Sequence, residues 1–172
     1  MAFAIMCLEE AVLRLAQDVS WWEWLLKRLW SYTSTADLDE WQENAAELIP
    51  SVVVASEDYA DGGFERLTAD EFTNLRELYA SNDPLLGQMV DLVFEIGTLE
   101  MFGGLENGAP VSLEKLSTLV RLMAEHSLCE PEVSVVASKS FAQCHGWGSP
   151  FEWGPLSRIL MVQIPFCSTF DR

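Results

Sequence analysis

The alternation of apolar and polar residues predicts two adjacent helices, one over about residues 20–30 and one beginning near Asp37. In the first, apolar residues recur at the spacing of one helix face (Trp22, Leu25, Leu26, Leu29 and Trp30). The segment SYTSTAD between them is rich in residues that favour turns. In the second, Leu38, Trp41, Ala45 and Leu48 form the apolar face, and Pro50 marks its end. We expect Trp30 and Trp41 to be buried where the two helices face each other.

The same periodicity predicts further helices over about residues 3–16, 69–81, 84–102 and 113–126. The helix over 84–102 is apolar on nearly all sides, which indicates a central position. Gly97 within it suggests a close approach of another helix or a kink. Capping residues are expected at the helix starts, and each has a short polar side chain that can accept a backbone N–H: Ser20, Asp37, Thr68, Asp83 and Ser112.

The segments outside these helices are less regular. SVVVASED after Pro50 suits a helical turn or an irregular segment, and YADGGFERL predicts a loop in which Gly62 and Gly63 permit positive φ. From Glu130 onward the helical pattern fades, which predicts an irregular arm packed across the helices. The expected fold is therefore all-α: a single-domain bundle of about six helices over residues 1–155 with an irregular C-terminal arm, and a tail over 156–172 whose packing the sequence leaves open.

The net charge of the chain indicates what kind of partner it can bind. The chain has 172 residues, 49% of them apolar, and a net charge of −17 with a pI near 4.2. Such a balance argues against binding nucleic acid and favours a basic partner. Residues 37–71 contain 11 acidic residues and one basic residue, Arg66. This segment is either a solvated helix face with a polar loop, or a binding surface.

The expected location is the cytoplasm. No stretch approaches the ~20 apolar residues that span a bilayer, so no membrane association is expected. The sequence MAFAIMCLEE lacks the basic start of a secretory signal. The four cysteines (Cys7, Cys129, Cys144 and Cys167) are scattered, which is typical of reduced thiols rather than of a disulfide framework.

Few residues suggest catalysis or metal binding. A zinc set of His126, Cys129, Cys144 and His145 can be drawn, but adjacent Cys144 and His145 are poorly placed as two ligands of one tetrahedron. The same neighbours could suggest a thiol nucleophile, although adjacency in sequence is not pairing in space. Ordinary core or surface roles explain these four residues more simply.

Asp91 and Glu95 lie one turn apart on the apolar helix and could form an acid–base or metal-binding pair. The Glu-x-x-His partner of helical di-metal sites is not in the sequence, so a solvent edge or a structural salt bridge is the simpler interpretation. The sequence also has none of the motifs GxGxxG, GxxxxGK[ST], HExxH and GxSxG. We therefore expect no enzyme, no cofactor and no metal.

A set of short motifs occurs in a defined order: WSYTST with LDEWQENAAELIP, then EIGT followed by FGG, and finally HGWGSPFEW. Over residues 20–153 this set resembles a family of small helical immunity proteins of bacterial contact-dependent growth inhibition and related polymorphic-toxin systems. The resemblance implies that the chain binds and blocks the toxic C-terminal domain of its own system's toxin, which is often a nuclease.

The charge pattern is consistent with that role, because a nuclease must attract phosphates and an inhibitor can offer carboxylates in their place. The expected toxin-binding residues lie within 37–71: Asp39, Glu40, Glu43, Glu47, Glu57, Asp58, Tyr59 and Asp61. Two other classes stay open: an acidic secretion chaperone or nucleic-acid-mimicking inhibitor, and, as the minority interpretation, an enzyme or small-ligand protein.

Overall fold

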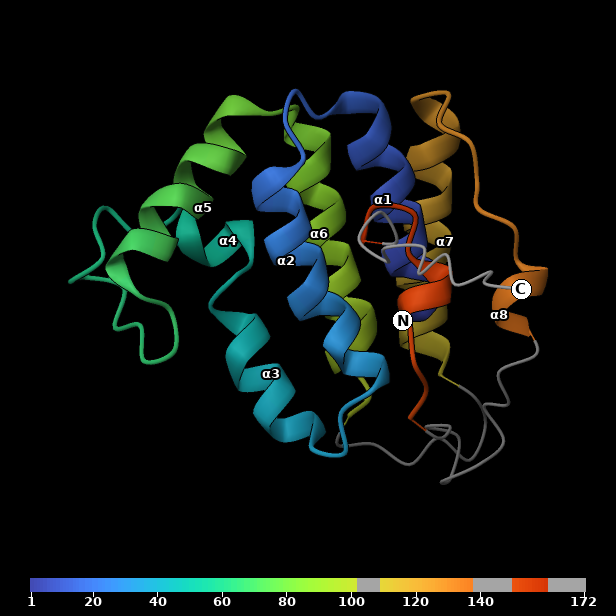
Figure 1. The fold of residues 1–172 in the computed structure, drawn as a ribbon, viewed down its shortest axis with the longest axis horizontal. Coiled ribbons are helices and arrows are strands. Elements are labelled where there is room, and N and C mark those ends of the chain that lie inside the picture. The colour runs from blue at the N-terminus through green and yellow to red at the C-terminus, as the bar shows by residue number, and fades with distance from the viewer. Residues whose placement is uncertain (102–108, 138–149, 161–172) are drawn as a thin grey trace, which may run out of the picture.

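The computed structural model describes residues 1–101, 109–137 and 150–160, which form α-helices, two short 3₁₀ helices and turns, with no strand among them (Figure 1). The all-α bundle expected from the sequence is confirmed. The described helices are α1 (Ala2–Leu15), α2 (Ser20–Trp30), α3 (Leu38–Ala46), α4 (Pro50–Val53), α5 (Ala69–Ser81), α6 (Pro84–Thr98), α7 (Pro110–Glu125) and α8 (Ser134–Ala137), with 3₁₀ turns η1 (Ser31–Thr33) and η3 (Gly154–Leu156).

Three helix starts are capped as the sequence predicts. The Asp37 carboxylate accepts the Glu40 N–H at the start of α3, and the Asp83 carboxylate accepts the Leu85 N–H at the start of α6. At α5 both halves of a capping box are present, because Thr68 accepts from the Glu71 backbone and Glu71 accepts from Thr68. These caps form within four residues of sequence, which is why local reasoning finds them.

Two predicted caps are wrong. Ser20 does not cap α2; Asp18 accepts both the Ser20 N–H (3.1 Å) and the Ser20 hydroxyl (2.9 Å). Ser112 does not cap α7, which begins at Pro110; the Glu100 carboxylate instead accepts the N–H groups of Val111 and Ser112 (both 3.2 Å). In both cases a preceding carboxylate supplies the acceptor, because a charged oxygen makes a stronger hydrogen bond than a hydroxyl.

Helix α6 is the centre of the bundle. It contacts α1, α3, α4, α5 and α7, and Figure 1 shows α3, α4 and α5 on one side of α2 and α6, with α7 on the other. Gly97 marks a close approach, because an added Cβ would lie 3.1 Å from the Met1 sulfur and 3.2 Å from the Trp41 ring. The regular helix ends at Thr98, earlier than the predicted end at 102, and turns follow through Met101.

Trp30 and Trp41 are buried, as expected from the helix pattern, with 0% and 4% of their surface exposed. Their ring partners are different from those implied by a simple facing pair. Trp30 stacks on Trp153 (6.0 Å between centroids), whereas Trp41 packs on Tyr32 and Phe94. Trp41 still joins α3 to α2, because its indole N–H donates to the Arg28 carbonyl (3.1 Å).

The described part of the C-terminal arm, residues 150–160, is fastened to the bundle by Glu9 of α1. Glu9 is 1% exposed, and its carboxylate accepts from the Trp30 indole N–H (2.7 Å), the Ser157 hydroxyl and the Arg158 N–H (2.7 Å). Leu156 and Ile159 are buried beside it. The segment 156–160, which the sequence assigns to a tail of open packing, therefore packs on the bundle through these residues, while residues 161–172 lie outside the described ranges.

Cys7 is buried in α1, and burial raises the pKa of its thiol to about 12, with the charges of Glu130 and Glu10 adding to the effect. A variant in which Cys129, Cys144 and Cys167 are replaced by serine should therefore not react with a thiol reagent at pH 8 while folded, and should react fully in denaturant. The measurement is the rate of colour release from Ellman's reagent. A native-state rate equal to that of the denatured chain would contradict the burial of Cys7.

Candidate functional site

The acidic segment, residues 37–71, runs through α3, α4, the loop 54–68 and the start of α5, on the side of the bundle away from α7 (Figure 1). Six of the eight expected toxin-binding residues are exposed there: Asp39, Glu40, Glu43, Glu57, Asp58 and Asp61. Glu47 and Tyr59 are half-buried. The structure thus places one group of candidates on α3 and a second group in the loop.

The Glu47 carboxylate binds the backbone of the loop through three hydrogen bonds. One carboxylate oxygen accepts the Glu65 N–H (2.8 Å), and the other accepts the N–H groups of Arg66 (2.9 Å) and Leu67 (2.7 Å). A carboxylate that binds three consecutive backbone donors has little capacity left for a partner's cation. Glu47 therefore positions the returning end of the loop against the C-terminal end of α3.

Two basic side chains near this surface form ion pairs within the chain. Arg66 contacts Glu43 (2.7 Å) and Arg28 contacts Glu71 (2.9 Å), and both pairs are partly exposed. Arg28 also lies 3.6 Å from the centroid of the Trp24 ring, the cation–π contact that their spacing permits. Exposed pairs of this kind contribute about 0–1 kcal/mol each, so they orient side chains more than they stabilise the fold.

An aromatic cluster supports the outer part of the loop. Phe64 lies against Tyr59 (5.7 Å between centroids) and against Phe72 of α5 (5.1 Å). Gly63 has a φ of +62°, as expected for a glycine turn, whereas Gly62 is required for space, because an added Cβ would lie 2.0 Å from the Phe64 ring. The loop is therefore an ordered platform rather than a polar linker.

Four of the candidate carboxylates have no hydrogen bond or ion pair within the part of the chain that the structure describes: Asp39, Glu40, Glu57 and Asp61. Asp58 accepts the Asp61 N–H (2.9 Å). Three further exposed acids of this kind, Glu65, Asp70 and Glu77, were not among the residues selected from the sequence. These unpaired, exposed carboxylates are the groups that remain available to a basic partner.

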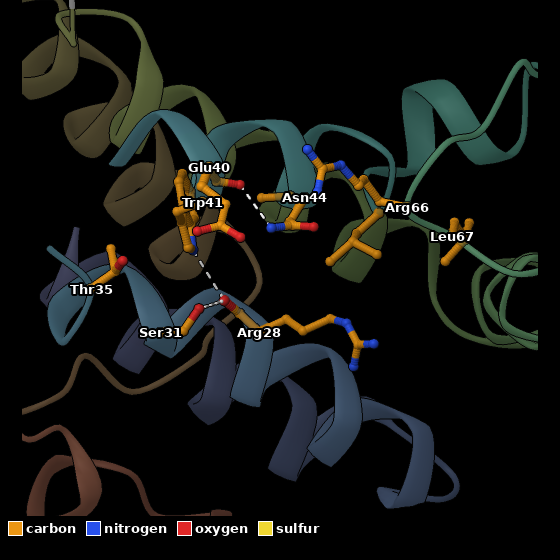
Figure 2. A pocket seen from close by; sticks show the side chains of 10 residues that line it. Arg28, Ser31, Thr35, Glu40, Trp41, Asn44, Arg66 and Leu67 are labelled. Atoms are coloured by element: carbon orange, nitrogen blue, oxygen red, sulfur yellow. Dashed lines mark hydrogen bonds between the residues drawn. The ribbon is translucent and has the colours of Figure 1, made fainter. Parts of the chain in front are cut away.

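An open groove of about 360 Å³ separates α2 from α3 (Figure 2). Trp41 and Leu48 contribute its apolar part, and Glu40, Arg28 and Arg66 contribute charges of both signs. In Figure 2 the Trp41 indole and the Ser31 hydroxyl both donate to the Arg28 carbonyl. Sequence reasoning did not find this groove, because Arg28 and Arg66 are 38 residues apart and only the fold brings them together.

The other chemical candidates have structural roles or lie outside the described ranges. Asp91 accepts from the Ser51 hydroxyl (2.9 Å) and N–H, and burial raises the pKa of Asp91 despite these bonds. Glu95 pairs with Lys115 (2.7 Å), in agreement with the salt-bridge interpretation. Cys129 is exposed, and Cys144 and His145 are not among the described residues. No cluster of three potential metal ligands occurs in the described ranges.

A first prediction for this site separates Glu47 from its neighbour Glu43. Glu47→Gln should lower the free energy of unfolding by about 1–3 kcal/mol, because it replaces one of two accepting oxygens with an NH2 group that faces a backbone N–H, and should speed hydrogen exchange at residues 65–67. Glu43→Gln, which removes the same charge one turn away, should change stability by less than about 1 kcal/mol. Chemical denaturation and amide exchange measure both effects; equal behaviour of the two variants would contradict the positioning role of Glu47.

Comparison of the chain with protein-family models, with curated proteins and with solved structures found no match. In the described helices, none combines the length and apolarity needed to cross a bilayer.

Proposed function

We propose that this chain is an immunity protein of a bacterial contact-dependent growth inhibition or related toxin system. It acts in the cytoplasm of the cell that makes it, by binding the toxic C-terminal domain of its cognate toxin, a basic nuclease. The proposal combines the ordered motifs of the sequence with the surface that the acidic segment forms. It involves no catalysis by this chain, no cofactor and no nucleic acid.

The observation that carries the proposal is the state of the exposed carboxylates. Asp39 and Glu40 on α3, and Glu57 and Asp61 in the loop, have no cation or hydrogen-bond donor in the described part of the chain. A folded domain gains nothing in stability from like charges placed close together, since they repel one another. A basic partner would relieve that repulsion and pair with the same groups.

The acidic segment is held in a fixed conformation, which favours binding of a partner. The caps at Asp37 and Thr68, the Glu47 anchor and the aromatic cluster fix the loop before binding, so little conformational entropy is lost on association. A nuclease cleft that attracts phosphates would meet carboxylates in their place, and occupation of the cleft by this surface would exclude the nucleic acid substrate.

The test is co-expression of this chain with the toxin domain encoded beside it. We expect the chain to restore growth of cells that produce the toxin domain, to co-purify with it, and to inhibit its nuclease activity at a one-to-one ratio. A toxin domain from an unrelated system and an ordinary basic protein such as ribonuclease A serve as controls. Equal binding to all three would favour a general nucleic-acid-mimicking inhibitor, and no protection by a folded, expressed chain would contradict the proposal.

A further inference from the structure

A second depression lies on the outer side of α5, where the helix meets the loop of the acidic segment. It is an open hollow of about 450 Å³, and we call it the α5 hollow. Tyr59, which is half-buried, provides aromatic surface in it, whereas the ring of Phe72 beneath is only 4% exposed, and small residues of α5 also line the hollow. The acidic residues Glu57, Asp58 and Glu77 also line it.

Charge within the α5 hollow is not balanced. Its lining has three acidic residues and one cation, Arg76, whose guanidinium donates to the backbone carbonyl of Glu57. In the described part of the chain neither Glu57 nor Glu77 has an ion-pair partner. The hollow therefore combines the partly exposed ring of Tyr59 with a net excess of two negative charges.

We propose that the α5 hollow receives an arginine side chain of the basic partner. An arginine offers an aliphatic stem for the apolar surface and a planar guanidinium that can stack on an aromatic face while it pairs with carboxylates. A purely apolar side chain would leave the acidic residues without a charged partner, and a small cation would leave the Tyr59 ring uncovered.

This inference rests on the proposed function only for the source of the arginine, so the hollow can be tested without a toxin. The probe is N-acetyl-arginine amide, titrated into the isotopically labelled chain and followed by amide chemical shifts. Guanidinium chloride supplies the charge without the stem, and N-acetyl-norleucine amide supplies the stem without the charge. We expect saturable shifts at residues 57–59 and 72–80, with a dissociation constant on the order of millimolar, and weaker binding of both partial probes.

A charge variant and a matched control sharpen the test. Glu57→Gln with Glu77→Gln should weaken binding of the arginine probe by about fivefold, the effect of losing two exposed ion pairs. Glu114→Gln with Glu125→Gln removes the same charge from exposed positions on α7 and should leave binding unchanged. A retained fold is checked by the unaltered spectrum of the remaining residues.

Three results would overturn the inference: equal affinity of the norleucine probe, shifts spread evenly over all acidic surfaces, or the same loss in the α7 control as in the hollow variant. Failure of the proposed function looks different. In that case the arginine probe would still occupy the hollow, while the neighbouring toxin domain would neither bind nor be inhibited.

Discussion

Replacing Trp30 with alanine should lower the free energy of unfolding by about 3–5 kcal/mol. The side chain is fully buried, stacks on Trp153 of the C-terminal arm and donates its indole N–H to Glu9. Its removal leaves a large cavity between α1, α2 and the arm, and it deprives a buried carboxylate of one of three donors. Urea denaturation followed by circular dichroism gives the change in stability directly.

Two further variants divide the effect into its causes. Trp30→Phe keeps most of the apolar volume and removes the hydrogen bond to Glu9, so it should cost about 1.5–3 kcal/mol in unfolding free energy. Trp21→Phe, at a half-buried tryptophan of the same helix, should cost clearly less. If Trp30→Ala unfolded at the wild-type urea concentration, the packing of the arm on α1 and α2 would be wrong.

The parts of the fold that the sequence predicts are those determined by nearby residues. The apolar face of α2 and the caps at Asp37, Thr68 and Asp83 depend on groups within one or two turns, and these predictions are confirmed. The predicted start of α7, with Ser112 as its cap, is wrong. The acceptor is the Glu100 carboxylate, which lies 11 residues before Val111 and outside the helix.

The parts that the sequence could not predict depend on distant contacts. Glu9 lies in an apolar helix and accepts a hydrogen bond from the Ser157 hydroxyl, 148 residues away in the sequence. The residues next to Glu9 give no indication of this donor. A buried carboxylate needs several donors to offset the loss of water, so Glu9 and the arm are placed together. The burial of Leu156, Ser157 and Ile159 follows from the same contact.

For the candidate site, the sequence predicts where acidic residues concentrate but not which of them are free. Glu43 lies on α3 and Glu47 follows one turn later at the end of the helix, yet Glu43 pairs with Arg66 and Glu47 anchors the backbone of residues 65–67. Only the path of the loop decides this division. The distinction matters for function, because a carboxylate that is already engaged has less to offer a partner.

The second large effect concerns binding. A variant that combines Asp39→Asn, Glu40→Gln, Glu57→Gln and Asp61→Asn should slow association with the cognate toxin domain by at least about tenfold at low salt. These four carboxylates are exposed and unpaired in the described chain, so their loss removes the attraction that guides encounter and leaves the folded core intact. The difference from the unaltered chain should narrow as salt rises, because salt screens exposed charges.

The matched control is a variant with glutamine at four exposed acidic positions elsewhere, Glu114, Glu125, Glu130 and Glu132. Each variant loses four negative charges and moves the net charge from −17 to −13, so a difference between them reports position rather than total charge. Stopped-flow association at two salt concentrations and growth protection measure the outcome. If both variants associate and protect equally well, the acidic segment is a solvated face, and the toxin must bind elsewhere on this chain; slower association of the first variant alone places the interface on α3 and its adjoining loop.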